Sequence, residues 1–176
     1  QAKMWDWLRL ADDVQRTVKL LTHEFLLKPK LKRDADQMQQ FAANHQNEWL
    51  VDFMRVLASD EGFPKEDIDK GVAWFDDCFR QLDTALADAD WLVGGKFTLA
   101  DIAWLPNVHR MELMHWDLAL YPNLLRWYQR CKERPSYRTA LAAHEPGFIT
   151  EFFEEYTRQR ISDGTSVMGF GPFAGP

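Results

Sequence analysis

The stretch FTLADI at residues 97–102 contains the signals that start an α-helix, and it decides the fold prediction for this chain. Thr98 is placed as the N-cap residue, whose side chain accepts a hydrogen bond from the backbone N–H of Asp101. The Asp101 carboxylate in turn accepts one from the N–H of Thr98. Phe97 and Ile102 are placed to form the hydrophobic staple that fixes how the chain enters the helix. The stretch therefore predicts a capped helix that begins at Thr98.

Apolar residues before this stretch predict three further helices. In the first, the apolar side chains recur at steps of three and four residues, which places them on one helix face: Trp7, Ala11, Val14, Val18, Leu21 and Phe25. Pro29 ends this helix, because proline cannot continue the backbone hydrogen-bond ladder. A capping box of Asp34 and Gln37 opens a second helix over 34–58. Regular apolar spacing predicts a third over about 65–87.

Glycine is distributed in a way that disfavours β-structure. None of the nine glycines occurs in the first sixty residues, and four of them fall in the last thirteen. Strand-and-turn folds need glycine-containing turns throughout, whereas Pro122, Pro135 and Pro146 are each suited to the first turn of a helix. The sequence therefore predicts one all-α domain of about six or seven helices over residues 1–161. An irregular Gly/Pro-rich tail is expected over 162–176.

Composition excludes several classes of protein. The chain has 176 residues, of which 46% are hydrophobic and 27% charged, as in an ordinary soluble domain with one core. A net charge of −6 disfavours nucleic-acid binding, and no apolar run reaches the roughly 18 residues that a membrane span needs. Two cysteines, Cys78 and Cys131, cannot form a disulfide framework, which favours free thiols in a reducing cytoplasm. The chain starts at Gln1 without a signal-peptide pattern, so we expect it to be part of a longer protein.

The residues with catalytic side chains do not form a self-contained active site. His109, Glu112 and His115 give an H-x-x-E-x-x-H pattern, but di-iron bundles use the E-x-x-H pair twice, together with two further glutamates. The pair occurs once here, which favours polar residues on a helix surface over metal ligands. Neither cysteine lies in a C-x-x-C motif, and the chain has no G-x-S-x-G nucleophile turn. These patterns alone indicate a binding or docking domain.

Four pieces of sequence, taken in order, resemble the all-helical C-terminal domain of the glutathione transferase family. They are WLVGGKFTLADIA at 91–103, YPNL at 121–124, Trp127 and RPS at 134–136. The resemblance covers 74–143 best. In this family a thioredoxin-like N-terminal domain precedes the helical domain, and no strand pattern of that kind occurs in this chain. The 34–58 helix is extra relative to commoner members, and insertions there resemble bacterial transferases that act on aromatic ethers or halogenated hydroquinones.

The resemblance implies a transferase in which glutathione, as co-substrate, is bound mainly by the thioredoxin-like domain. The helical domain then supplies the pocket for the acceptor substrate, called the H-site, and contacts within a homodimer. The candidates for substrate binding lie on the first helix and on the capped core helix: Trp7, Leu10, Val14, Trp104 and Val108. Trp7 and Val14 also belong to the apolar face of the first helix, so a core role stays open for them. Thr98 and Asp101 have a structural role in the family.

The reaction implied by the resemblance is attack of the glutathione thiolate on a small hydrophobic, aromatic electrophile. It would serve detoxification in the cytoplasm. No residue of this chain resembles the family's thiol-activating group, so we expect the chain to be inactive alone. The alternative is a non-catalytic interaction module, because the same helical fold docks partners in translation factors and synthetases.

Overall fold

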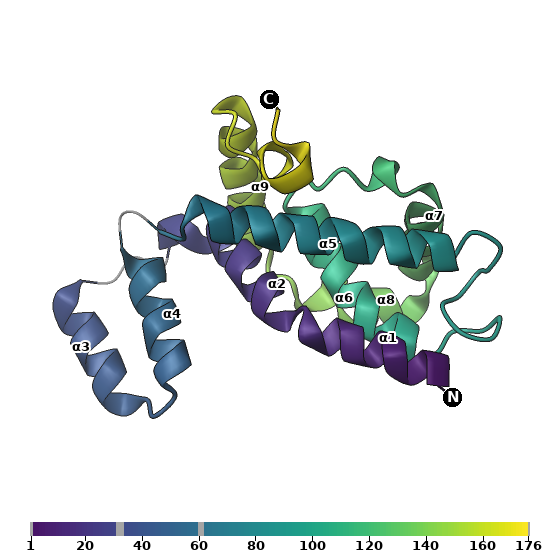
Figure 1. The fold of residues 1–176 in the computed structure, drawn as a ribbon, viewed down its shortest axis with the longest axis horizontal. Coiled ribbons are helices and arrows are strands. Elements are labelled where there is room, and N and C mark those ends of the chain that lie inside the picture. Colours follow the sequence, from purple (N-terminus) through teal and green to yellow (C-terminus); the bar gives the residue numbers. More distant parts are fainter. Residues whose placement is uncertain (1, 31–33, 60–61, 176) are drawn as a thin grey trace.

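The computed structural model describes residues 2–30, 34–59 and 62–175, and within these it contains helices and no strand. The predicted all-α fold is confirmed. The α-helices of these residues, shown in Figure 1, are α1 Ala2–Asp13, α2 Gln15–Thr22, α3 Ala35–Asn44, α4 Glu48–Ala58, α5 Lys65–Ala85, α6 Leu99–Leu113, α7 Pro122–Glu133, α8 Pro135–Ala140 and α9 Gly147–Ser162. There are more helices than the six or seven predicted, because the first and the second predicted helix are each divided in two.

Helix α6 lies in the core of the fold, and its residues Trp104 and Val108 are fully buried. Helix α1 packs along α6 (Figure 1), and the indole N–H of Trp104 donates a hydrogen bond to the carbonyl oxygen of Trp7 at 3.1 Å. Helix α5 packs against α2 at Gly71, where an added Cβ would lie 3.2 Å from Cγ2 of Thr17. The absence of a side chain at this glycine therefore lets the two helices approach closely.

The first predicted helix is present but is not regular. It consists of α1, α2, a π-helix at His23–Leu27 and a 3-10 turn at Lys28–Lys30. The backbone stays hydrogen-bonded between α1 and α2, since the N–H of Val18 donates to the carbonyl oxygen of Val14 at 2.9 Å. Within the π-helix, the buried Glu24 carboxylate accepts a hydrogen bond from Nη1 of Arg160 in α9 at 2.9 Å. The wider helical turn thus coincides with a buried ion pair formed with a distant part of the chain.

The prediction of one helix over 34–58 is wrong, because the chain forms α3 and α4 with a short turn between them. The capping box at its start is confirmed. The N–H of Gln37 donates to Oδ1 of Asp34 at 2.8 Å, and the N–H of Asp34 donates to Oε1 of Gln37 at 3.2 Å. Asn47 caps α4 in a similar way, since its side-chain oxygen accepts from the N–H of Leu50 at 3.2 Å. A second local cap therefore starts a new helix where apolar spacing alone would continue the first.

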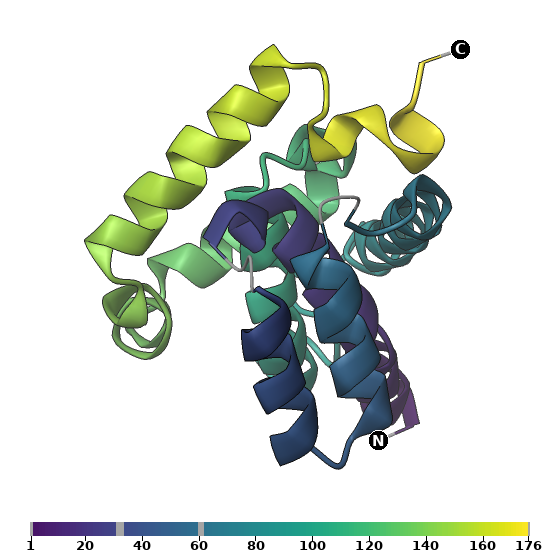
Figure 2. The same ribbon diagram turned by 90° about the vertical axis from the view of Figure 1, so that its left-hand side faces the viewer.

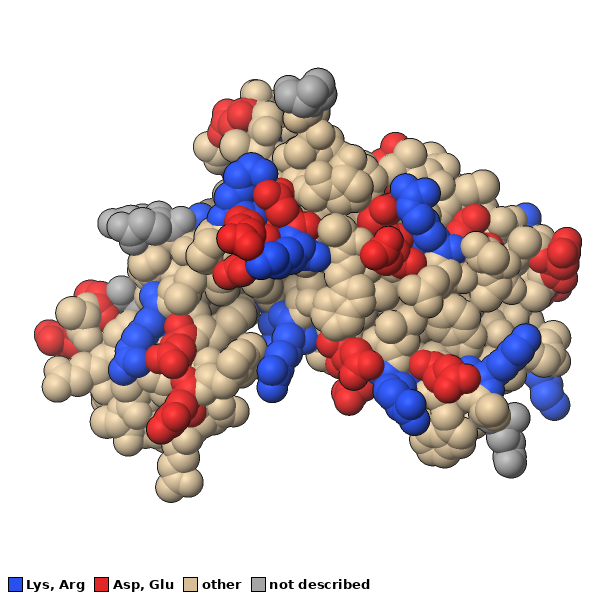
Figure 3. Space-filling view, viewed as in Figure 1, with Lys and Arg blue, Asp and Glu red and all other residues tan. Residues whose placement is uncertain are grey.

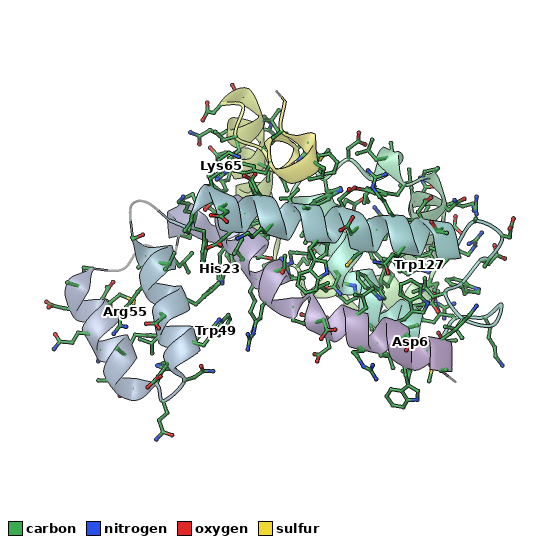
Figure 4. The ribbon with its side chains drawn as sticks, in the orientation of Figure 1. Asp6, His23, Trp49, Arg55, Lys65 and Trp127 are labelled. Atoms are coloured by element: carbon green, nitrogen blue, oxygen red, sulfur yellow. The ribbon has the colours of Figure 1, made fainter. Side chains whose placement is uncertain are left out.

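Helices α3 and α4 form a hairpin that projects from the rest of the fold, as Figures 1 and 2 show. The hairpin has apolar residues of its own, since Val51, Met54 and Leu57 are buried outside the main core cluster. A hollow of about 400 Å³ lies between α4 and α2, and Trp49 is one of its lining residues. In Figure 4 the Trp49 side chain points from α4 toward α2. The guanidinium of Arg16 lies 5.2 Å from the centre of the Trp49 ring. The hairpin thus contacts the body through aromatic side chains around a hollow.

The segment predicted to be an irregular tail packs against the helical body. It contains 3-10 turns at Val167–Gly169 and Gly171–Phe173, and the second of them lies against α5. The N–H of Gly171 donates to Oδ1 of Asp69 at 2.8 Å. Gly171 has a φ of +56°, and an added Cβ would lie 2.9 Å from the carbonyl oxygen of Asp69. The positive φ and the close approach both require glycine at this position.

The surface carries both signs of charge. Figure 3 shows acidic and basic side chains interspersed over one face, with no large patch of a single sign. In the part of the chain that the structure describes, no helix combines the length and the apolar content needed to cross a membrane.

Candidate functional site

The capping box at the start of α6 is present, and its carboxylate is completely buried. Oδ2 of Asp101 accepts hydrogen bonds from the N–H of Thr98 at 2.8 Å and from the Thr98 hydroxyl at 3.0 Å. Oδ1 accepts from the backbone N–H of Leu92 at 3.1 Å and from the indole N–H of Trp127 at 2.9 Å. One carboxylate thus joins the loop before α6, the start of α6 and helix α7. Its position and contacts are those of a structural group.

Of the two residues predicted to form the hydrophobic staple, Phe97 packs against other side chains and Ile102 stays largely exposed. The ring of Phe97 meets Trp91 edge-on at a centre-to-centre distance of 5.2 Å, and the Arg134 guanidinium lies 3.8 Å from the Phe97 ring centre. Ile102, the other predicted member, remains 51% exposed. Phe97 therefore packs against the preceding loop and the residue that follows α7, and its burial does not depend on Ile102.

The five predicted substrate-binding residues fall into two groups. Val14, Trp104 and Val108 have no exposed surface and belong to the core. Trp7 and Leu10 are half-buried, and they border a hollow of about 430 Å³ between α1 and α5. We call this the α1–α5 hollow. Its lining residues are Lys3, Asp6, Trp7, Leu10, Gln81, Ala85 and Leu92.

The α1–α5 hollow has a mainly apolar wall and a polar rim. Its apolar surface comes from Trp7, Leu10 and Leu92. Asp6, another residue that borders the hollow, is labelled on α1 in Figure 4. A volume of about 430 Å³ is within the range of small-molecule sites, which are roughly 300–1,000 Å³. Gln81 and Ala85 also border the hollow but are not among the predicted substrate-binding residues. Their spacing of four residues on the third predicted helix places both on one face.

A second group of polar residues surrounds His109, which is 5% exposed. Its Nδ1 lies 2.9 Å from the hydroxyl oxygen of Tyr128 and 3.0 Å from that of Tyr137. Its Nε2 lies 2.7 Å from Oε1 of Glu145. The hydroxyl of Tyr128 donates to Oε2 of Glu112 at 2.6 Å. These residues come from α6, α7, α8 and the segment before α9, and we call them the His109 network.

The prediction that the H-x-x-E-x-x-H residues lie on a helix surface is wrong for His109, which is buried, and its side chain and that of Glu112 belong to the His109 network. Glu112 accepts a hydrogen bond from Nζ of Lys132 at 2.8 Å. Burial alone would raise the pKa of Glu112, but the His109 ring at 3.8 Å and hydrogen bonds from Lys132 and Tyr128 lower it to about 2. His115 is exposed and has a φ of 59°. Within the described ranges there is no cluster of three His, Cys, Asp or Glu residues able to hold a metal ion.

The two cysteines are free and have no exposed surface. Burial raises the pKa of both the Cys78 and the Cys131 thiol to about 12. The thiolate, which is the nucleophilic form, is therefore scarce at neutral pH. Both side chains act as small apolar core residues.

Residues 65–130, which span α5, α6 and most of α7, match the family described as glutathione S-transferase, C-terminal domain. Tetrachloro-P-hydroquinone reductive dehalogenase of Sphingobium chlorophenolicum is 40% identical over 62 residues, which are 34% of this chain and 25% of that protein. Glutathione S-transferase GstB of Escherichia coli K12 is 37% identical over 71 residues, or 40% of this chain and 34% of that protein. Disulfide-bond oxidoreductase YfcG of the same organism is 33% identical over 69 residues, or 39% of this chain and 32% of that protein. No solved structure matches the chain.

The chain spans about a third or less of the length of these curated relatives. The family match at 65–130 includes Asp101, Thr98, Leu92 and Trp127, and so contains the whole buried cap of α6. The sequence resemblance, the helical fold and this family match all indicate the same domain. Residues 65–130 therefore belong to a glutathione S-transferase C-terminal domain.

Proposed function

We propose that this domain forms the acceptor-binding side of a glutathione-dependent transferase that acts on a small, hydrophobic, aromatic electrophile. The observation that carries this proposal is the α1–α5 hollow, which is bordered by Trp7 and Leu10 on α1 and whose α5 side lies within the residues 65–130 that match this family. An apolar wall with few polar groups suits an aromatic substrate. Further support comes from the name of one relative, a reductive dehalogenase of a chlorinated hydroquinone.

In the proposed reaction, glutathione supplies the thiolate that attacks the electrophilic carbon and displaces its leaving group. We assign glutathione binding to a thioredoxin-like domain outside this chain. Trp7 and Leu10 hold the aromatic acceptor, and the Gln81 amide at the wall provides a polar contact that orients it. Holding two reactants in a fixed geometry replaces a bimolecular encounter by an effectively unimolecular step. Trp104 supports the wall from the core through its hydrogen bond to the Trp7 backbone. The proposal places the active protein in the cytoplasm as a homodimer.

Trp7→Ala should selectively weaken use of the acceptor in a protein that contains both domains. We expect kcat/KM for a chloronitrobenzene to fall at least about tenfold, because an apolar contact in a substrate pocket contributes about 1–3 kcal/mol. The KM for glutathione should not change. Trp74→Ala is the matched control, since Trp74 lies on α5, is 38% exposed and does not border the hollow. Equal losses in both variants, or a raised KM for glutathione alone, would contradict the assignment of Trp7.

The isolated chain should neither bind glutathione tightly nor conjugate it, because the buried cysteines and the α1–α5 hollow provide no group that activates a thiol. Titration calorimetry on the chain alone and on a protein that carries both domains gives the comparison. Micromolar affinity for the chain alone would overturn the division of roles between the domains. Glutathione binding by the two-domain protein without any conjugation would favour a non-catalytic interaction module.

A further inference from the structure

The His109 network joins the segment 142–146, which precedes α9, to the centre of the fold. Glu145 belongs to this segment and Pro146 is the N-cap residue of α9. We propose that His109 is a pH-dependent clasp: its doubly protonated ring fastens Glu145 to α6 by a charge-assisted hydrogen bond, and this hold on the segment 142–146 weakens when the ring loses its charge.

Hydrogen-bond donors and acceptors determine which atoms of the network carry protons. Glu112 is ionised, because it also accepts from Lys132, and an ionised carboxylate only accepts hydrogen bonds. The hydroxyl of Tyr128, 2.6 Å from Glu112, must therefore donate its single proton to that carboxylate. The Tyr128 oxygen then acts as an acceptor toward Nδ1 of His109 at 2.9 Å. In this arrangement Nδ1 of His109 carries a proton, and its N–H donates to the Tyr128 oxygen and to the Tyr137 oxygen at 3.0 Å.

The same reasoning applies to the other side of the ring. Nε2 of His109 lies 2.7 Å from Oε1 of Glu145, and an ionised Glu145 only accepts. Nε2 must then also carry a proton, so the ring is a cation. A neutral ring protonated on Nε2 would keep the Glu145 bond, but its Nδ1 lone pair would face the Tyr128 oxygen at 2.9 Å. The contacts on both sides of the ring are therefore best satisfied by the protonated form.

The charges around the ring come from each element packed against it. Helix α6 contributes Glu112 and Arg110, helix α7 contributes Lys132, and the segment before α9 contributes Glu145. The remaining polar groups are the hydroxyls of Tyr128 on α7 and Tyr137 on α8. Among these charged groups, the two carboxylates lie within hydrogen-bond or ion-pair distance of the ring, Glu145 at 2.7 Å and Glu112 at 3.8 Å. They favour the cationic form of His109.

The contacts of the segment 142–146 explain why the clasp matters for it. Its backbone hydrogen bonds are local, for example from the N–H of Glu145 to the carbonyl oxygen of Ala142 at 3.2 Å. Ala142, Ala143 and His144 are exposed. Among the described residues, the contact between Glu145 and His109 is the one side-chain hydrogen bond that joins this segment to another helix. A weaker bond therefore loosens the segment 142–146, while Leu141 before it and Ile149 after it stay packed against the core.

The direction of the pH effect follows from the surroundings of the ring. Burial by itself lowers the pKa of His109, but the nearby carboxylates of Glu112 at 3.8 Å and Glu145 at 2.7 Å outweigh it and hold the pKa above its ordinary value of 6.5. A group whose pKa is raised by folding stabilises the folded state fully below its unfolded pKa. This stabilisation is lost as the pH rises through the folded pKa. The clasp is therefore strongest at and below pH 6.5 and weakens on the alkaline side.

The test combines nuclear magnetic resonance of the ring nitrogens with hydrogen exchange of the segment, both followed across a pH series. We expect both nitrogens of His109 to be protonated at pH 6.5. Protection of the amides at 142–149 should fall when His109 loses a proton above that pH, more than the intrinsic exchange rate accounts for. His115→Gln is the control, since His115 is exposed and lies just after the end of α6, and it should leave both transitions in place. A neutral His109 ring at pH 6.5 would overturn the proposal, and so would protection that does not follow its titration.

Glu145→Gln tests the link between the ring and the segment in a position that is only partly buried. The amide oxygen can still accept from Nε2 but carries no charge. We expect the pKa of His109 to fall by about one unit, which is a tenfold weaker binding of the proton, and the loss of protection at 142–149 to shift to lower pH by the same amount. Glu151→Gln removes the same charge at an exposed site on α9 and should have no effect. A purely structural role for Glu145 predicts equal loss of protection at every pH, which would contradict the clasp.

Discussion

Asp101→Ala should lower the free energy of unfolding by about 3–5 kcal/mol, because it leaves several buried donors without an acceptor at about 1–3 kcal/mol each. The donors are the backbone N–H groups of Thr98 and Leu92 and the indole N–H of Trp127. The change also removes the negative charge from the N-terminus of α6, where it interacts favourably with the helix dipole. A loss of this size is a large share of a typical domain stability of roughly 5–15 kcal/mol.

Urea titrations of Asp101→Ala and Asp13→Ala would measure this effect against a control. Asp13 ends α1 and is exposed, so its removal should cost less than about 0.5 kcal/mol. Asp101→Asn should fall between the two, since it keeps one acceptor oxygen and the shape of the side chain. Equal urea midpoints for the Asp101→Ala and Asp13→Ala variants would refute the buried cap as the link between α6, α7 and the loop before them.

Arg160→Met should cost about 2–4 kcal/mol, because the buried Glu24 carboxylate then keeps only its longer contact with Lys28 at 3.2 Å. Arg160 is 8% exposed, and its Nη1 donates to Oε1 of Glu24 at 2.9 Å and to the Glu24 carbonyl oxygen at 3.1 Å. Its Nε donates to the carbonyl oxygen of Thr165 at 2.8 Å, near the end of α9. Methionine keeps much of the apolar stem, so the loss reports on the charge and its hydrogen bonds.

The control for this prediction is Arg158→Met, two residues earlier on α9. Arg158 is exposed, and its contact with Glu154 is long at 3.7 Å, so its loss should cost less than about 0.5 kcal/mol. The double variant Arg160→Met with Glu24→Gln should recover part of the stability, because no buried charge is left unpaired. If Arg160→Met and Arg158→Met unfold at the same urea concentration, the pair at Glu24 does not hold α9 to the π-helix.

Local signals in the sequence were sufficient for the start of several helices. The capping boxes that begin at Asp34 and Thr98, and the prolines that open α7 and α8, involve residues only a few positions apart. These starts are therefore determined by short-range geometry. The cap at Asn47 is equally local, but the apolar pattern runs through it, and for this reason apolar spacing predicts a single helix over 34–58 where the chain forms two.

Contacts between distant residues could not be predicted from local signals. The π-helix at His23–Leu27 coincides with a bond between Glu24 and Arg160, which are 136 residues apart. In the same way, spacing places Trp7 and Val14 on one helix face without showing that Val14 is fully buried and that Trp7 borders a hollow. Burial depends on which helices pack against that face, and one sequence does not contain this information. The assignment of the substrate-binding residues accordingly stays a prediction.

The α3–α4 hairpin has a consequence for how this chain could change in evolution. Lys28, which lies before the hairpin, and Gly62, which lies after it, are in contact. The Lys28 ammonium would be 2.5 Å from a Cβ added to Gly62. The hairpin also buries Val51, Met54 and Leu57 apart from the main core. A gene segment between these two points can therefore be gained, lost or exchanged as a unit, because the body then needs only a short connection between neighbouring ends. The hairpin is in this sense a module, and the aromatic residues that face the body are the positions where a replacement would have to adapt.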